Sequence, residues 1–372
     1  MSDRKHMLKL GTLLVVVALL ALIALPAAAQ NVDEGNAGDV ALVPVSIPAA
    51  GAPFLEIPAE MRLSGLRPVY QQFNRCSSAA LTIQMSYFGW GGSYDEAIRG
   101  LNPHSEDVAV RLEEMADFAR ANGLRAHWGI GGTLDLLRQL VAAEIPVLIE
   151  QGYYDSNDIN DWMSHNRVVM GYNDAAQEFY VFDPLLGNGP DGTGRPMTYE
   201  FVAERWRPFA NDYLVLYEPE DEFMVQQILG QHLDPIFGAE NAIRQAQAEI
   251  DNGSSDSFTY FNLGTAYNVL GRYENAAEAF DRARSTGLPW RMMWYQYGPL
   301  EAYLEVGRYD DVITLARSVI SSEVGVEEMY YYAGLAYEAQ GQFDRARANF
   351  QVAVQRNAFF SAAQTALRRV GG

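Results

Sequence analysis

The sequence predicts an α+β domain followed by an all-α array of helical repeats. Between residues 63 and 218, helical patterns come first and strand patterns follow, an order typical of an α+β domain. From about Gly238 onward the pattern is only helical, and one unit recurs at spacings of 36 and 34 residues. The 372 residues suffice for two such domains and a targeting segment, since single domains usually contain roughly 100 to 200 residues.

Apolar spacing and turn residues predict the individual elements of the first domain. Helices are expected at residues 79–88, from a cap at Ser105 to a stop at Gly123, and at about 134–143. Short runs rich in Val, Ile, Tyr and Phe predict strands at 146–149, 167–172, 179–182 and 213–217.

The repeated unit lies in the last third of the chain. Each copy reads Ala-Tyr, three residues, Gly, one residue, an aromatic and an acidic residue, and the copies begin at Ala266, Ala302 and Ala336. This period, with Gly at the turn between two helices, resembles the tetratricopeptide repeat. Stacked hairpins of this kind form a concave surface that typically binds a protein partner. The alternative is that the array serves only as a brace for the first domain.

The N-terminus has the pattern of an export signal. Arg4, Lys5 and Lys9 precede an apolar run over residues 10–25, and three alanines at 27–29 suit cleavage. The protein is therefore expected to be secreted, or to be tethered to the membrane by this segment, whose length is close to the roughly 20 apolar residues that span a bilayer. No Cys follows the run, which excludes a lipoprotein.

Charge and motif content exclude several kinds of partner and chemistry. The formal net charge is −20, and a nucleic-acid partner is not expected because phosphate binding depends on clustered Lys and Arg. No Lys follows Lys9, which excludes Ser-Lys dyads and Schiff bases. No cofactor or metal is expected: the glycines at 187, 189 and 192 are not followed by a helix, and the aspartates at 155, 158 and 161 lack the Gly and Glu of a calcium loop.

The sole cysteine, Cys76, stands where the first helix of the domain begins. A helix N-terminus favours the thiolate, which is the form that a nucleophile needs. An upstream amide could donate a hydrogen bond to the oxyanion that forms when the thiolate attacks a carbonyl, and Gln71 is preferred over Gln72 and Asn74. The alternative is that Cys76 is an inert residue of the core.

A thiolate nucleophile needs a base and a group that orients it. His165 opens one strand-like run and Asp183 ends the next, across a turn near Asp174. An antiparallel hairpin centred on Asp174 would place His165 opposite Asp183. His165 could instead be structural, and Asp183 before a proline could only form a turn.

These motifs together resemble the papain-like cysteine peptidases related to the double-glycine leader peptidases of bacteriocin exporters. The resemblance rests on Gln-x-x-Asn-x-Cys at a helix start, a Pro-Val-Leu-Ile strand, His before Val-Val-x-Gly-Tyr, and Asp-Pro after the next strand. It implies that Cys76 is the nucleophile, His165 the base, Asp183 its orienting partner and Gln71 the oxyanion donor. The chain differs from these relatives at Ser77 and Ser78, where they commonly have Gly-Pro.

The expected domains are a signal or anchor at 1–29, a linker at 30–62, a papain-like peptidase domain at 63–218, connecting helices at 219–255 and tetratricopeptide repeats at 256–372. The predicted function is that of an exported cysteine peptidase, with a peptide or protein substrate and repeats that bind substrate or partner. The alternative function is a peptidase-like fold that has lost catalysis and binds peptides as a scaffold.

Overall fold

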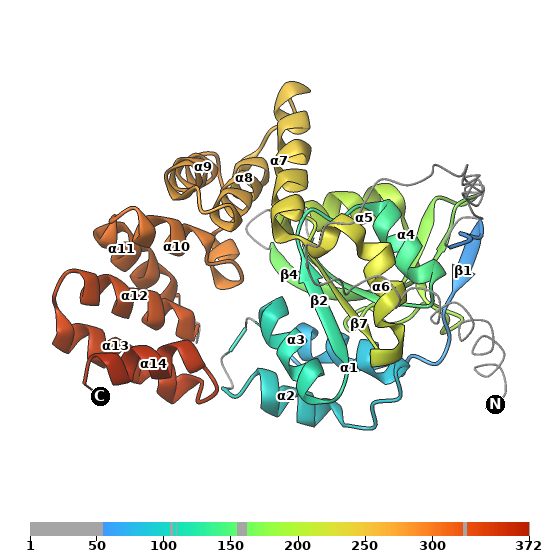
Figure 1. Ribbon diagram of the computed structural model, residues 1–372, viewed down its shortest axis with the longest axis horizontal. Coiled ribbons are helices and arrows are strands. Elements are labelled where there is room, and N and C mark those ends of the chain that lie inside the picture. Colours follow the sequence, from blue (N-terminus) through green and yellow to red (C-terminus); the bar gives the residue numbers. More distant parts are fainter. Residues whose placement is uncertain (1–54, 105–106, 109, 155–161, 323–325, 372) are drawn as a thin grey trace, which may run out of the picture. The chain divides into compact units, whose positions relative to one another are not determined.

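The computed structural model describes residues 55–104, 107–108, 110–154, 162–322 and 326–371 (Figure 1). The predicted export signal at 1–29, the predicted cap at Ser105 and the three aspartates at 155, 158 and 161 lie outside these residues. Among the residues that are described, no helix has both the length and the apolar character needed to cross a membrane.

An antiparallel sheet of seven strands forms the centre of the first domain. Its strands are β1 (Glu60–Arg62), β2 (Arg125–Gly129), β3 (Val147–Tyr153), β4 (Met163–Asn173), β5 (Glu178–Phe182), β6 (Arg195–Thr198) and β7 (Tyr213–Tyr217). The order is β2-β7-β3-β4-β5-β6, and β1, at the end of the segment expected to be a linker, pairs with β4. The strands expected at 146–149, 167–172, 179–182 and 213–217 are confirmed as β3, β4, β5 and β7.

Helices cover this sheet and bury its apolar side chains. They are α1 (Cys76–Tyr87), α2 (Tyr94–Leu101), α3 (Leu112–Ala121), α4 (Leu134–Ala142), α5 (Tyr199–Trp206), the short 3-10 helix η5 (Arg207–Phe209) and α6 (Glu222–Leu229). Both α1 and α4 pack on β4, and α5 packs on β3. The helix expected from Ser105 begins later, at Leu112, because the Glu114 carboxylate accepts the Arg111 N–H at 3.0 Å and so starts the helix there.

The C-terminal third forms the predicted helical hairpins. After α7 (Pro235–Asp251), the three copies correspond to α8 (Ser257–Val269) with α9 (Tyr273–Ser285), α10 (Gly298–Glu305) with α11 (Tyr309–Ile320), and α12 (Glu327–Ala339) with α13 (Phe343–Arg356), followed by α14 (Ser361–Arg369) (Figure 1). Gly271 lies at the turn of the first hairpin, between α8 and α9, and has a φ of 65°. Gly264 is required by packing, since a Cβ there would lie 2.6 Å from the Phe280 ring.

The repeat array packs against the first domain through an aromatic cluster. Trp162, which is 1% exposed and directly precedes β4, stacks on Phe209 with a ring-centroid distance of 5.7 Å and contacts Phe258 of α8 at 5.7 Å. Beside this cluster, Arg207 forms ion pairs with Glu249 at 3.0 Å and with Asp256 at 2.6 Å. These contacts show that the array has a bracing role, whether or not it also binds a partner.

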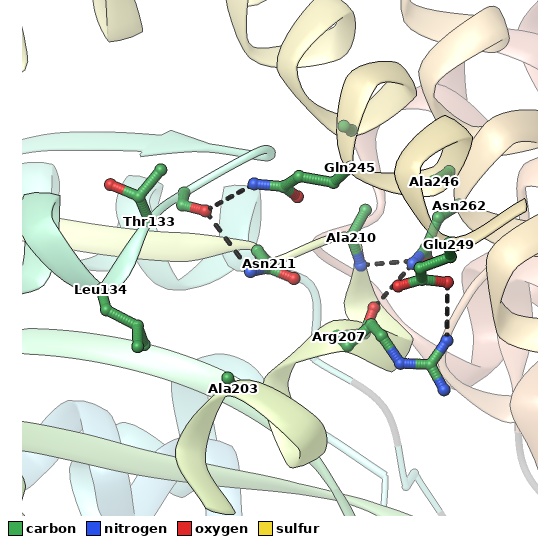
Figure 2. Close-up of a pocket in the computed structure, with 12 residues that line it drawn as sticks. Thr133, Leu134, Ala203, Arg207, Ala210, Asn211, Gln245, Ala246, Glu249 and Asn262 are labelled. Atoms are coloured by element: carbon green, nitrogen blue, oxygen red, sulfur yellow. Dashed lines mark hydrogen bonds and ion pairs between the residues drawn. The ribbon is translucent and has the colours of Figure 1, made fainter. Parts of the chain in front are cut away.

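A cavity of about 320 Å³ lies at the same junction, where α7 and α8 face the start of α4 and η5 (Figure 2). The amides of Gln245 and Asn211 both donate to the Gly132 carbonyl oxygen, at 3.1 and 3.4 Å. Asn262 donates to the Arg207 carbonyl oxygen at 2.7 Å and accepts the Ala210 N–H at 3.1 Å. Gln245 and Asn262 therefore join the C-terminal helices to the first domain at this cavity, whereas Asn211 bonds within the first domain.

Candidate active site

Cys76 is the first residue of α1, and a tight turn places it there. Asn74 has a φ of 55°, and the Arg75 N–H donates to the Gln72 carbonyl oxygen at 3.1 Å. The Tyr94 hydroxyl accepts the Gln72 N–H at 2.9 Å and donates to the Arg75 carbonyl oxygen at 3.3 Å. Tyr94 thus ties both ends of the turn, which fixes where the thiol projects.

The two serines that follow Cys76 are buried in α1. The Ser78 hydroxyl donates to Asn102 Oδ1 at 2.5 Å, and the Asn102 amide donates to Asp107 Oδ2 at 3.4 Å. Arg75 donates to the main-chain oxygen of Asp107 at 2.5 Å. In place of Gly-Pro, the start of α1 is therefore held by a polar network from the loop after α2.

The Cys76 thiol lies beside His165 and Asn166 of β4, the strand on which α1 packs. The Asn166 amide lies 3.7 Å from Sγ, and its main-chain N–H also points at the sulfur. Burial raises the pKa of the thiol, but the hydrogen bond and charge of His165, with the two Asn166 contacts, lower the pKa of Cys76 to about 7. A substantial fraction of the thiol is therefore ionised at neutral pH.

His165 is held by Asp183 from the side opposite Cys76. His165 Nε2 donates to Asp183 Oδ1 at 2.8 Å, and Arg167 Nε donates to Asp183 Oδ2 at 2.7 Å. Burial and the Arg167 charge lower the pKa of His165, but the bonds to Asp183 and Cys76 outweigh them and raise it. Burial raises the pKa of Asp183, but the bond and charge of His165 and the charge of Arg167 hold it well below its usual range. The site is thus built to carry an imidazolium between two anions.

The hairpin register that predicted this contact is wrong, although the contact exists. Val168 faces Phe182, so the next position along β5 places Asp183 beside Arg167 rather than opposite His165. His165 reaches Asp183 as a diagonal neighbour two residues away, a separation that long side chains can bridge. The shift arises mainly at the turn, because Asn173 faces Glu178 and the hairpin is therefore centred between residues 175 and 176 instead of on Asp174. A slip between Val169 and Gly171, where β4 also pairs with β1, changes the register by one residue.

Gln71 belongs to the loop that precedes Cys76 and contacts the loop that follows Asp183. Its N–H donates to the Pro184 carbonyl oxygen at 2.8 Å, while its buried Oε1 accepts no hydrogen bond from the described residues. Of the two alternatives, Gln72 is exposed, and Asn74 lies in the turn before Cys76 with a φ of 55°. The structure therefore brings Cys76, His165 and Asp183 together, and it places the main chain of Gln71 beside the residue that follows Asp183.

The sequence reasoning missed a pair of buried carboxyl groups behind the site. The Glu150 carboxylate accepts the Ser164 hydroxyl, and the Glu150 N–H donates to Asp212 Oδ1 at 3.3 Å. Burial, with the nearby Cys76 charge, raises the pKa of Glu150 to about 8, and burial raises that of Asp212 well above its usual range. An acidic residue inside an apolar strand was the available signal for this pair.

Comparison with known families and structures agrees with this architecture. The model of the Peptidase_C39 like family matches residues 56–214, and a tetratricopeptide-repeat model matches residues 328–358. A search of the curated proteins found no match.

The similar chains among the solved structures include the following three. A structure described as a C39-like peptidase from Bacillus anthracis has 18% identity and a TM-score of 0.34, covering 43% of this chain and 98% of its own. A double glycine motif protease from an AMS/PCAT transporter, in complex with the leader peptide, has 16% identity and a TM-score of 0.32, covering 42% and 93%. A MamA RS-1 ArsTM double mutant has 21% identity and a TM-score of 0.33, covering 40% and 83%.

Proposed function

Because the chain carries a C39-like peptidase domain followed by tetratricopeptide repeats, we propose that it is an exported cysteine peptidase whose repeats bind substrate or a protein partner. In this proposal Cys76 is the nucleophile, His165 the general base, Asp183 the residue that positions His165, and Gln71 the oxyanion donor. The observation that carries it is the placement of His165 beside Cys76, with Asp183 Oδ1 bound to His165 Nε2 at 2.8 Å. The apolar N-terminal segment supports export of the chain, with or without a remaining membrane tether.

The proposed reaction follows from the orientation of the imidazole. Its Nε2 is bound to Asp183, so Nδ1 faces the thiol. The thiolate attacks the peptide carbonyl carbon, the C–N bond breaks, and the imidazolium gives its proton to the leaving amine. Water then attacks the thioester while His165 accepts a proton, which releases the acid and restores the free thiol.

The first test is whether the thiol hydrolyses peptide bonds at all. Incubation of the full chain with a peptide library, followed by mass spectrometry, is expected to reveal cleavage products at neutral pH. The Cys76→Ala variant is expected to yield none above background, because no thioester can form. Identical product profiles from the two proteins, or no cleavage by either, would refute hydrolysis by Cys76.

Replacing Gln71 by Ala is expected to lower turnover about a hundredfold, because one oxyanion donor is lost. Labelling of Cys76 by iodoacetamide should remain within about twofold of the native rate, since alkylation forms no oxyanion. The matched control is Gln72→Ala, whose side chain is exposed on the same loop. Equal turnover of Gln71→Ala and Gln72→Ala would remove Gln71 from the mechanism.

A further inference from the structure

One edge of β4 beside Cys76 is covered by the repeat array instead of by a strand. β5 pairs with β4 only from Val168 onward, which leaves the earlier part of that edge to other groups. There the Asn166 N–H points at the Cys76 sulfur, and the Ser164 N–H points at the hydroxyl of Tyr295. N–H groups two residues apart on a strand point to the same side and are separated by about 7 Å. Tyr295 therefore lies next to the nucleophile along the edge of β4.

Tyr295 comes from the other domain. It directly follows the 3-10 helix η8 (Trp290–Trp294), between α9 and α10, and η8 contacts β4. Its ring packs edge-on against Trp162, with a centroid distance of 6.2 Å and an interplanar angle of 64°. Burial, and then the nearby charges of Cys76 and Glu150, raise the pKa of Tyr295, which agrees with a neutral hydroxyl close to the thiol.

We propose that Tyr295 is a specificity-determining residue through which the repeat array forms one wall of the candidate active site. The ring occupies the edge of β4 that an approaching chain would otherwise follow, so it excludes bulky groups from this side of Cys76. This inference rests on the proposed function, because it assigns a substrate-selecting role at the same site. It makes the repeats part of the site in addition to any binding of partners.

Alkylation of the full chain tests the wall without requiring peptidase activity. Cys76 is the only cysteine, so iodoacetamide and its bulky fluorescein derivative, which share one reactive group, report on the same atom. Relative to the native protein, Tyr295→Ala is expected to raise the ratio of bulky to small labelling rates about tenfold, because the steric barrier is removed. Tyr295→Phe, which keeps the ring, should leave the ratio within about twofold. If Tyr295→Ala does not fold, the same ratio is measured for Tyr295→Leu, which keeps an apolar contact with Trp162.

The matched control is Tyr331→Ala, which removes a ring that packs on Phe350 and Phe360 inside the array. Its ratio should stay native, so an equal rise in this variant would assign the effect to loosening of the array and overturn the proposal. An unchanged ratio in the folded Tyr295 variants would also overturn it. In the peptide library, Tyr295→Ala should accept larger residues near the cleaved bond. If the native protein cleaves no peptide, the proposed peptidase function is refuted. If it cleaves peptides but the labelling ratio of the folded Tyr295 variants is unchanged, only the proposed role of Tyr295 is refuted.

Discussion

Replacing His165 by Ala is expected to lower peptide hydrolysis about a thousandfold, because both the base and the acid for the leaving amine are lost. The same variant should raise the pKa of Cys76 above its ordinary value. Burial favours the neutral thiol, and His165 is the main group that offsets it to give a pKa of about 7. Native labelling should therefore rise with pH through about 7, while labelling of His165→Ala should rise only above about 8.5, the usual thiol pKa. The measurement is the iodoacetamide rate from pH 5 to 10.

Hydrolysis by the native protein should instead follow a bell-shaped curve. Activity rises as Cys76 loses its proton and falls again as His165 loses the proton that the leaving amine needs, at a pH displaced upward because the pKa of His165 is raised. The control is His232→Ala, whose ring packs edge-on against Tyr213 and Phe237. A native-like labelling profile in His165→Ala would show that the imidazole does not stabilise the thiolate.

Replacing Asp183 by Ala is expected to destabilise the fold by about 3 to 5 kcal/mol, because it leaves a buried guanidinium without its carboxylate. The Arg167 side chain is 2% exposed; besides Asp183 it donates to Gln151 Oε1 at 2.6 Å and lies over the Tyr153 ring, 5.8 Å from its centroid. Asp183 also accepts the N–H groups of Leu185 and Leu186 at 2.8 and 2.9 Å. Asp183→Asn retains one acceptor for these donors, so it should cost less stability but still slow hydrolysis. Urea unfolding measures the first effect and peptide cleavage the second.

The contribution of Asp183 to the free energy of unfolding depends on pH. The pKa of Asp183 is depressed in the folded protein, so its stabilisation is fully present above the unfolded value of about 4 and is lost as the pH falls below it. The matched control is Asp174→Ala, which breaks the partly exposed pair with Arg138 at 2.5 Å and should cost about 1 kcal/mol or less. Equal losses in the two variants would mean that Arg167 finds water or another partner.

The regular elements of this fold were predictable because their sequences carry strong periods. The strand at 213–217 and the helix at about 134–143 agree closely with β7 and α4, and the recurring Ala-Tyr unit located each hairpin. The elements that were not predicted, such as β2, lack such periods. β2 reads Arg-Ala-His-Trp-Gly with no β-branched residue, and its side chains are mostly half-buried or exposed. It is a strand because it pairs with β7, which is a tertiary contact.

The site could be predicted in its residues but not in its geometry. Cys76 and the pairing of His165 with Asp183 were accessible, whereas the register was not, because the turn is centred after Asp174 and β4 slips by one residue near Gly171, where it pairs with β1. A Cβ at that position would lie 2.7 Å from the Met61 carbonyl oxygen. Arg167 could have been found, since it lies two residues after His165 and so on the same face. Tyr295 could not, since nothing in its local sequence indicates packing on a different domain.

The position of Trp162 has a consequence for how stability is shared along the chain. This side chain directly precedes the strand that carries His165, yet its ring neighbours include Phe258 and Tyr295 from the C-terminal third. The cooperative unit is therefore larger than the 56–214 segment that the family model matches. By thermodynamic linkage, if a partner bound to the array changed the affinity of the site at Cys76 for a substrate, that substrate would change the affinity for the partner by the same factor.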